Sequence, residues 1–182
     1  MVLRVLETEA LADAALPVAQ LATHMRLAEG YALVPGQEDR LRLRLRAAIA
    51  TIERRLGLIL IAREVVLTGP GGAARIAVPV GPNAVLVSVE QELGGVTSAI
   101  TGGVLRLEDT LGPVLELPKA PPETAQLRVI LQAGFANWDA VPAELAQAVL
   151  AWGEALDLGE DAPKAAERLI APWRAARIGA RV

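Results

Sequence analysis

The segment from Gln37 to Leu56 repeats apolar residues at helical spacing, and this long stripe sets the frame for the rest of the chain. Within it, Arg40 to Arg46 alternates arginine and leucine, which on its own is typical of a strand. Acidic residues at the start, Glu38 and Asp39, and Gly57 just past the end favour a helix instead. A single stripe at about 100° per residue contains the larger apolar set, Leu41, Leu45, Ala48, Ile49, Ile52 and Leu56.

A second, smaller apolar face on the same predicted helix is formed by Leu43, Ala47 and Ala50. A helix with two apolar faces often packs between two bodies. Two interpretations stay open at this point: the second face is buried within its own domain, or it contacts another subunit. The arginines flank the main stripe, where their stems can cover the edge of a core, so an anion site is the less favoured interpretation.

Helical spacing occupies both ends of the chain, and strand-like patterns occupy its middle. The expected elements are helices at 16–30, 37–57, 141–159 and 161–172, and a β-rich region at 58–135. The fold class that follows is α+β, a mainly helical body of about four helices with a small antiparallel β-region inserted between the second and third long helices. We expect residues 1–182 to form a single domain, because this length is usual for one domain.

Inside the β-rich region, alternating residues indicate strands, and glycine or proline indicates the turns. Ala73–Val80 and Ala84–Glu90 alternate on either side of Gly81-Pro82-Asn83, as in a sheet edge or a hairpin. Gln126–Gln132 is the clearest strand, with leucine and valine on one face. The stretch Gly69-Pro70-Gly71-Gly72 lacks the lysine and the helix that follow a phosphate loop, so we interpret it as a hairpin turn.

The composition excludes several classes of protein. Hydrophobic residues make up 53% of the 182 residues, which excludes intrinsic disorder. The sequence has no cysteine, which excludes disulfides, thiolate catalysis and cysteine-based metal sites. No apolar run reaches the roughly 18 residues that predict a membrane span. The net charge of −3 disfavours a protein that holds nucleic acid tightly.

No motif in the sequence indicates catalysis. Ser88 and Ser98 lie outside any nucleophile elbow, and His24 is the sole histidine, which favours a structural role. Acidic pairs such as Glu108-Asp109 and Glu160-Asp161 lie where turns and helix starts favour these residues. We therefore expect no catalytic residue, no cofactor and no metal.

Residues 173–182 form a short basic end. Trp173 opens it, Arg174, Arg177 and Arg181 carry its charge, and it contains no acidic residue. Two interpretations apply: a frayed terminus, or an arm that orders when it binds a partner.

Several of these segments together resemble the small head–tail connector, or adaptor, proteins of tailed bacteriophages and related gene transfer agents. The matching stretches are the long helix running into Gly57 and Leu60-Ile61, the proline-marked Ile76-Ala77-Val78-Pro79, Ala133-Gly134-Phe135 with Val141-Pro142, and the close Leu169–Arg174. Trp173 stands where the family usually has tyrosine. The resemblance spans nearly the whole chain, except 94–122.

The resemblance implies a structural adaptor that forms a ring of about a dozen subunits between the portal and the rest of the neck or tail. The ring would line the channel through which DNA leaves the capsid, without specific DNA binding and without a membrane. Its partners would be copies of itself, the portal protein and a downstream stopper or tail protein. The protein would be located in the neck of a virion or phage-like particle, assembled in the host cytoplasm.

Within that picture, the expected contact with the neighbouring subunit is Leu43, Ala47 and Ala50. The expected portal-binding residues are Trp173, Arg174, Arg177 and Arg181. The main alternative is a small-molecule-binding or enzymatic domain with a site of dispersed acidic and arginine side chains. A helix-turn-helix regulator is disfavoured, because a long linker precedes the arginine-bearing helix.

Overall fold

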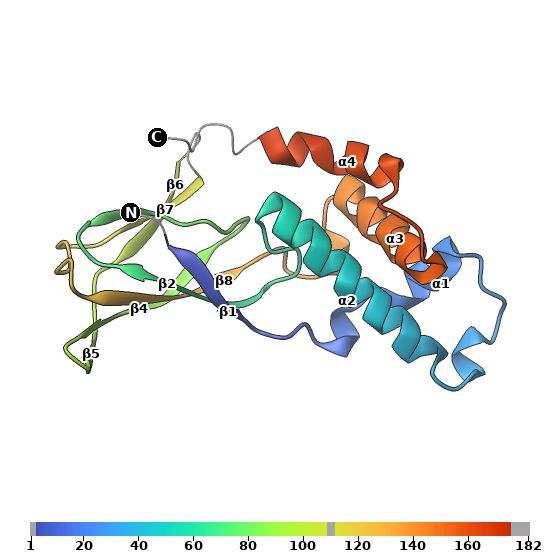
Figure 1. Ribbon diagram of the computed structural model, residues 1–182, viewed down its shortest axis with the longest axis horizontal. Helices are drawn as coiled ribbons and strands as arrows, with labels where there is room; N and C mark the ends of the chain where they lie inside the picture. The colour runs from blue at the N-terminus through green and yellow to red at the C-terminus, as the bar shows by residue number, and fades with distance from the viewer. Residues whose placement is uncertain (1–2, 109–111, 176–182) are drawn as a thin grey trace. The chain divides into compact units, whose positions relative to one another are not determined.

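The computed structural model describes residues 3–108 and 112–175 (Figure 1). These residues form four α-helices, with antiparallel strands inserted between the second and third of them, so the α+β class is confirmed. They divide into two compact units. The helical unit runs from Leu11 to Leu56 and resumes at Ala136, whereas the β unit contains the chain before Leu11 and from Gly57 to Phe135.

The helical unit contains α1 (Val18–His24), α2 (Gln37–Leu56), α3 (Ala143–Leu158) and α4 (Lys164–Ala175). In Figure 1, α2 and α3 lie side by side, and α4 packs on α3. The main apolar stripe of α2 is buried as predicted, together with the α3 stripe that contains Leu145, Ala148, Val149 and Trp152. Two apolar stripes packed against each other therefore form the core of this unit.

Polar contacts tie these helices together around the core. Arg55 of α2 lies 4.7 Å from the centre of the Trp152 ring on α3, and it also forms an ion pair with Glu167 of α4. Farther along, Arg40 Nε of α2 lies 3.1 Å from Asp157 Oδ1 of α3. These contacts fix the order in which α2, α3 and α4 pack.

The β unit consists of two antiparallel sheets. The larger sheet has the order β1 (Arg4–Thr8), β2 (Arg63–Pro70), β8 (Gln126–Ala133), β4 (Val85–Leu93) and β5 (Val96–Ala99). The smaller sheet has the order β3 (Arg75–Ala77), β7 (Gly112–Glu116) and β6 (Val104–Glu108). Alternate residues of β2 and β8, including Leu67 and Val129, share one buried cluster with Ile76 and Leu115 of the smaller sheet. The two sheets thus share a core, and the opposite face of the larger sheet is free of it.

The inserted segment begins near Leu60 and ends at Phe135, and these two ends lie side by side. Phe135 donates its backbone N–H to the Leu60 carbonyl at 3.0 Å, and Ala62 donates to the Phe135 carbonyl at 2.8 Å. Gly134 makes this approach possible, because its φ of +118° suits glycine and a Cβ there would lie 2.7 Å from the backbone of Ile61 and Ala62.

Two turns differ from the prediction. Of the two alternatives predicted around Gly81-Pro82-Asn83, the hairpin is wrong, because β3 and β4 belong to different sheets, whereas a sheet edge fits β3, an edge strand of the smaller sheet. For the same reason, Gly69–Gly72 is not a hairpin turn, since it leads from β2 to β3 in the other sheet. Local alternation predicted these strands but could not assign their partners, which are set by packing between distant segments. The first strand, β1, was not predicted.

Helix ends also differ in two places. The first helix covers 18–24 and not 16–30, because Arg26, just after the C-cap Met25, adopts a left-handed φ angle of +53° that ends the helix early. The last helix was predicted to end at Pro172, but it continues to Ala175. Pro172 lies within the final turn, where its missing N–H removes a single helical hydrogen bond.

Candidate assembly surfaces

The predicted second face of α2 is exposed. Leu43 has 61% of its surface exposed to solvent, and Ala47 and Ala50 are also exposed. We call these three residues the α2 stripe. They lie opposite Leu45 and Ile52, which are fully buried against the rest of the helical unit. Within this unit, therefore, the stripe is not the inner surface of the core.

The charged residues beside the α2 stripe already have partners. Arg42 donates to Asp39 Oδ1 at 2.8 Å and to Glu38 on the preceding turn. Hydrogen bonds to Asp39 and then to Glu38 raise the pKa of Arg42 above its already high ordinary value, so it stays a cation. On the same flank, Arg46 donates to Asp13 Oδ1 at 2.7 Å.

The opposite flank of α2 also carries ion pairs. Arg40 and Arg44 both face Asp157 of α3, whose side chain is 8% exposed. The alternating arginines therefore divide between the two sides of the helix, as the sequence predicted, and pair with neighbouring carboxylates. Arg44 Nε and Asp157 Oδ1 form their ion pair without a hydrogen bond to either atom among the described residues. An apolar strip between ion-paired charges is suited to a protein contact more than to binding an anion.

The predicted portal-binding residues lie at the end of α4, and the structure describes them in part. Trp173 is half-buried and helical, and so is not part of an extended arm. The backbone of Arg174 belongs to the same helix. Arg177 and Arg181 lie outside the described residues. The structure does not bring Trp173 into one cluster with the α2 stripe.

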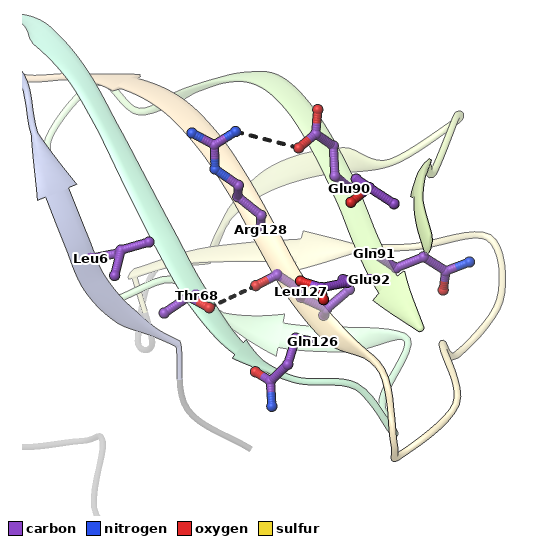
Figure 2. A pocket seen from close by; sticks show the side chains of 9 residues that line it. Leu6, Thr68, Glu90, Gln91, Glu92, Gln126, Leu127 and Arg128 are labelled. Atoms are coloured by element: carbon purple, nitrogen blue, oxygen red, sulfur yellow. Dashed lines mark hydrogen bonds and ion pairs between the residues drawn. The ribbon is translucent and has the colours of Figure 1, made fainter. Parts of the chain in front are cut away.

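The outer face of the larger sheet has an open hollow (Figure 2). It reaches from Leu6 of β1 to Thr97 of β5, across Thr68 and Arg128 on the strands between them. Arg128 Nη1 lies 3.5 Å from Glu90 Oε2, and Thr68 Oγ1 donates to the Leu127 carbonyl at 3.0 Å. The hollow therefore contains a paired cation and anion on an open sheet surface, with a second carboxylate, that of Glu92, on the same strand as Glu90.

The candidate chemical groups of the sequence remain dispersed. His24 Nε2 faces Glu154 Oε2 at 3.2 Å, and the Ser98 hydroxyl accepts from Gln91. Over residues 3–108 and 112–175, no three His, Asp or Glu side chains gather as a metal site would require. Within the same ranges, no helix combines the length and apolar character needed to cross a bilayer.

The β unit has exposed apolar residues that were not predicted from the sequence. Leu93 and Val96 are 43% and 67% exposed and flank the Gly94-Gly95 turn between β4 and β5. The paired glycines indicated the turn, but nothing in the local pattern showed which side of the hairpin would face solvent.

No family model matches the chain, and no curated protein sequence matches it. Solved structures do match. A chain from the neck of an empty gene transfer agent particle, computed with C6 symmetry, has a TM-score of 0.80 and 30% identity, covering 100% of this chain and 97% of that one. A chain from the virion of a native gene transfer agent particle has a TM-score of 0.77 and 31% identity, with the same coverage of 100% and 97%. A chain from the neck of a native particle, computed with C12 symmetry, has a TM-score of 0.70 and 28% identity over 98% and 97% of the two chains.

These matches extend over both units and nearly the full length of each partner. The matches to chains of gene transfer agent necks support a structural component of the particle neck. The chain belongs to the head–tail connector family of tailed phages and gene transfer agents.

Proposed function

We propose that this protein is a structural component of the neck of a phage-like particle, in which it acts as the head–tail adaptor. The observation that carries the proposal is the full-length match to a chain from a gene transfer agent neck. Residues 1–182 would act together as one adaptor domain, with both compact units present in each subunit. In this role the protein provides surfaces for assembly, without catalysis and without a cofactor.

The adaptor would form a closed ring of about a dozen subunits. Neck structures computed with C6 and C12 symmetry among the matches support a cyclic arrangement. In a cyclic ring every interface is heterologous, so each subunit needs two different surfaces. The α2 stripe is our candidate for one of them, because Leu43, Ala47 and Ala50 are apolar, exposed and bordered by paired charges.

The ring would bind the portal at one end and a stopper or tail protein at the other. Portal binding is assigned to Trp173, Arg174, Arg177 and Arg181 at the end of the chain, where an aromatic residue precedes basic residues. Aromatic and arginine side chains often dominate the free energy of protein interfaces. Assembly would take place in the host cytoplasm, and the finished subunit would stay in the particle neck.

DNA would pass along the inside of the ring without specific contacts. A duplex is held mainly by lysine and arginine bound to its phosphates. A subunit with a net charge of −3 lacks the excess of cations needed for that binding. Low affinity is what a conduit requires, because DNA must slide through it.

The α2 stripe can be tested with a matched pair of substitutions. Leu43→Glu places a charge on the stripe, and we expect it to prevent ring formation while the subunit still unfolds cooperatively. Leu158→Glu is the control, because Leu158 of α3 has the same 61% exposure but lies outside the stripe. Light scattering after size-exclusion chromatography measures the assembly. If the two variants formed rings equally well, the α2 stripe would not be part of the subunit interface.

The function itself can be tested on the assembled particle. We expect electron microscopy of particles that carry a tagged chain to show the tag as a ring between portal and tail. Removing residues 176–182 should abolish co-sedimentation with portal rings, and replacing Arg177 and Arg181 by lysine should preserve it. A tag found elsewhere in the particle, or none in the particle, would contradict the adaptor role.

A further inference from the structure

The larger sheet of the β unit ends in two strands that have free outer edges. Its order places β1 at one edge and β5 at the other. Among the described residues, no strand pairs with the outer side of either one. Each edge therefore offers backbone donors and acceptors to another strand, in a regular row on β5 and in a row with a register shift between Val5 and Glu7 on β1.

The β5 edge lacks the features that usually protect a free edge. Its sequence is Val-Thr-Ser-Ala, every residue is exposed, and it contains no charge, proline or bulge. Natural proteins commonly protect such edges with lysine, proline or a bulge to avoid unwanted pairing. The neighbouring turn adds two exposed apolar residues, Leu93 and Val96. An unprotected edge beside exposed apolar side chains is suited to pairing with another chain.

The direction of the strands makes the two edges compatible. All four neighbouring pairs in this sheet are antiparallel, and the sheet has five strands. As a result, β1 and β5 run in the same direction. A rotation about a ring axis that roughly follows the strands keeps that direction, so β5 of one copy would meet β1 of the next as a parallel pair.

Charge on the outer face also fits such a contact. The register forms a row across the sheet in which Arg4 of β1 is at one end and Ala99 of β5 is at the other. Arg4 and Glu92 are both exposed, and within the described residues neither forms an ion pair. At a joined edge, Arg4 of one copy could reach Glu92 of its neighbour across the small Thr97 and Ala99 of β5.

We propose that subunits of the ring join edge to edge, with β5 of one copy adding to β1 of the next as a parallel pair. The occupant of the β5 edge is therefore a second copy of this chain. The inference rests on the proposed ring and adds a second contact to the α2 stripe. It requires two different surfaces at opposite edges of one sheet, which is the arrangement that a closed heterologous ring needs.

Disulfide cross-linking gives a direct test, because the natural sequence has no cysteine. Leu6 and Thr97 both line the hollow on the outer face of the sheet, at its two edge strands. Figure 2 shows Leu6 on β1. We would mix Leu6→Cys protein with Thr97→Cys protein, assemble rings and oxidise them. The expected product is a mixed dimer. A chain with both substitutions should give a ladder of covalent oligomers.

The control replaces Arg128 with cysteine, since Arg128 lies on the same face but on the central strand β8. Central and edge strands of one sheet are separated by about 10 Å, so Arg128→Cys mixed with Thr97→Cys should not cross-link. Equal cross-linking of the control and the test pair would overturn the inference. Rings that assemble without the mixed Leu6–Thr97 dimer would also overturn it, while leaving the adaptor role intact. Failure to form any ring would contradict the proposed function and this inference together.

A backbone test complements the cross-links. The hydrogen bond from Ile100 N–H to the Val89 carbonyl fixes which residues of β5 face β4, so the Thr97 N–H points to the free edge. Thr97→Pro removes that donor, and we expect about a tenfold rise in the concentration needed for ring assembly. Thr97→Val keeps the donor and should assemble normally. Unchanged assembly of Thr97→Pro, with the subunit folded, would contradict strand addition at this edge.

Discussion

At the scale of single residues, close backbone contacts decide which substitutions the fold tolerates. Gly134 combines a φ of +118° with a backbone 2.7 Å from its missing Cβ. We expect Gly134→Ala to lower the free energy of unfolding by at least about 1–3 kcal/mol, the usual range for a strained backbone position. Urea unfolding followed by circular dichroism measures this loss.

A second glycine distinguishes the cost of a positive φ angle from the cost of a steric clash with an added Cβ. Gly95 also has a positive φ, +81°, but a Cβ there would meet nothing within 4 Å. Gly95→Ala should therefore cost only about 1 kcal/mol. If both alanine variants lost the same stability, the contact of Gly134 with Ile61 and Ala62 would not be limiting.

We expect the Trp152 ring and the Arg55 guanidinium above it to contribute very differently to the free energy of unfolding. Trp152 is 4% exposed, so Trp152→Ala should destabilise the protein by about 3–5 kcal/mol. Arg55 is more exposed, at 39% of its side chain, and both its ring contact and its ion pair with Glu167 are partly solvated. Arg55→Met should cost about 1 kcal/mol or less. Thermal unfolding of the two variants provides the comparison, and a larger loss for Arg55→Met would contradict it.

At the scale of elements, proline within the last helix is the clearest departure from local preference. Pro172 is exposed and deprives α4 of one backbone hydrogen bond near its end. We expect Pro172→Ala to stabilise the protein by about 0.5–1 kcal/mol, measured as a higher urea midpoint at unchanged slope. A lower midpoint would show that the proline ring makes a packing contact that outweighs the missing bond.

The helices were more predictable than the strands, for a physical reason. A helix is specified by neighbours three and four residues apart, so the stripe from Leu41 to Leu56 was sufficient to define α2 and to place Leu43 on a second face, whereas the exposure of that face was left open. A strand acquires its partner from a distant segment. Alternation at Arg75–Ala77 therefore indicated a strand without revealing that it pairs with β7.

The candidate assembly surfaces differ in how well they could be predicted, as the helices and strands do. The α2 stripe could be predicted because helical geometry fixes which residues share a face. The two free edges of the larger sheet could not, because β1 was not predicted and the position of β5 at an edge depends on the whole strand order. Sequence patterns describe a segment, whereas an edge is a property of the assembled sheet.

At the scale of the whole molecule, the net charge of the subunit allows the proposed DNA conduit to be tested. We expect assembled rings to show no retention of linear duplex DNA in a gel-shift assay at physiological salt and micromolar protein, because the net charge is −3. Replacing Glu123 and Glu160 by lysine, two exposed residues away from the proposed subunit contacts, would supply added cations as a positive control for the assay. Retention of DNA by the natural ring would contradict the proposed conduit.

The hydrogen-bonded junction at the base of the strand insertion has a consequence for how such proteins diversify. Its two ends are tied together by the hydrogen bonds of Phe135 to Leu60 and Ala62. The turns between these ends, such as the β4–β5 turn, can therefore change in length while the two hydrogen-bonded ends keep their spacing. Because β1 lies outside the insertion and pairs with β2, we expect related particles to vary the turns and to keep the strands of the larger sheet.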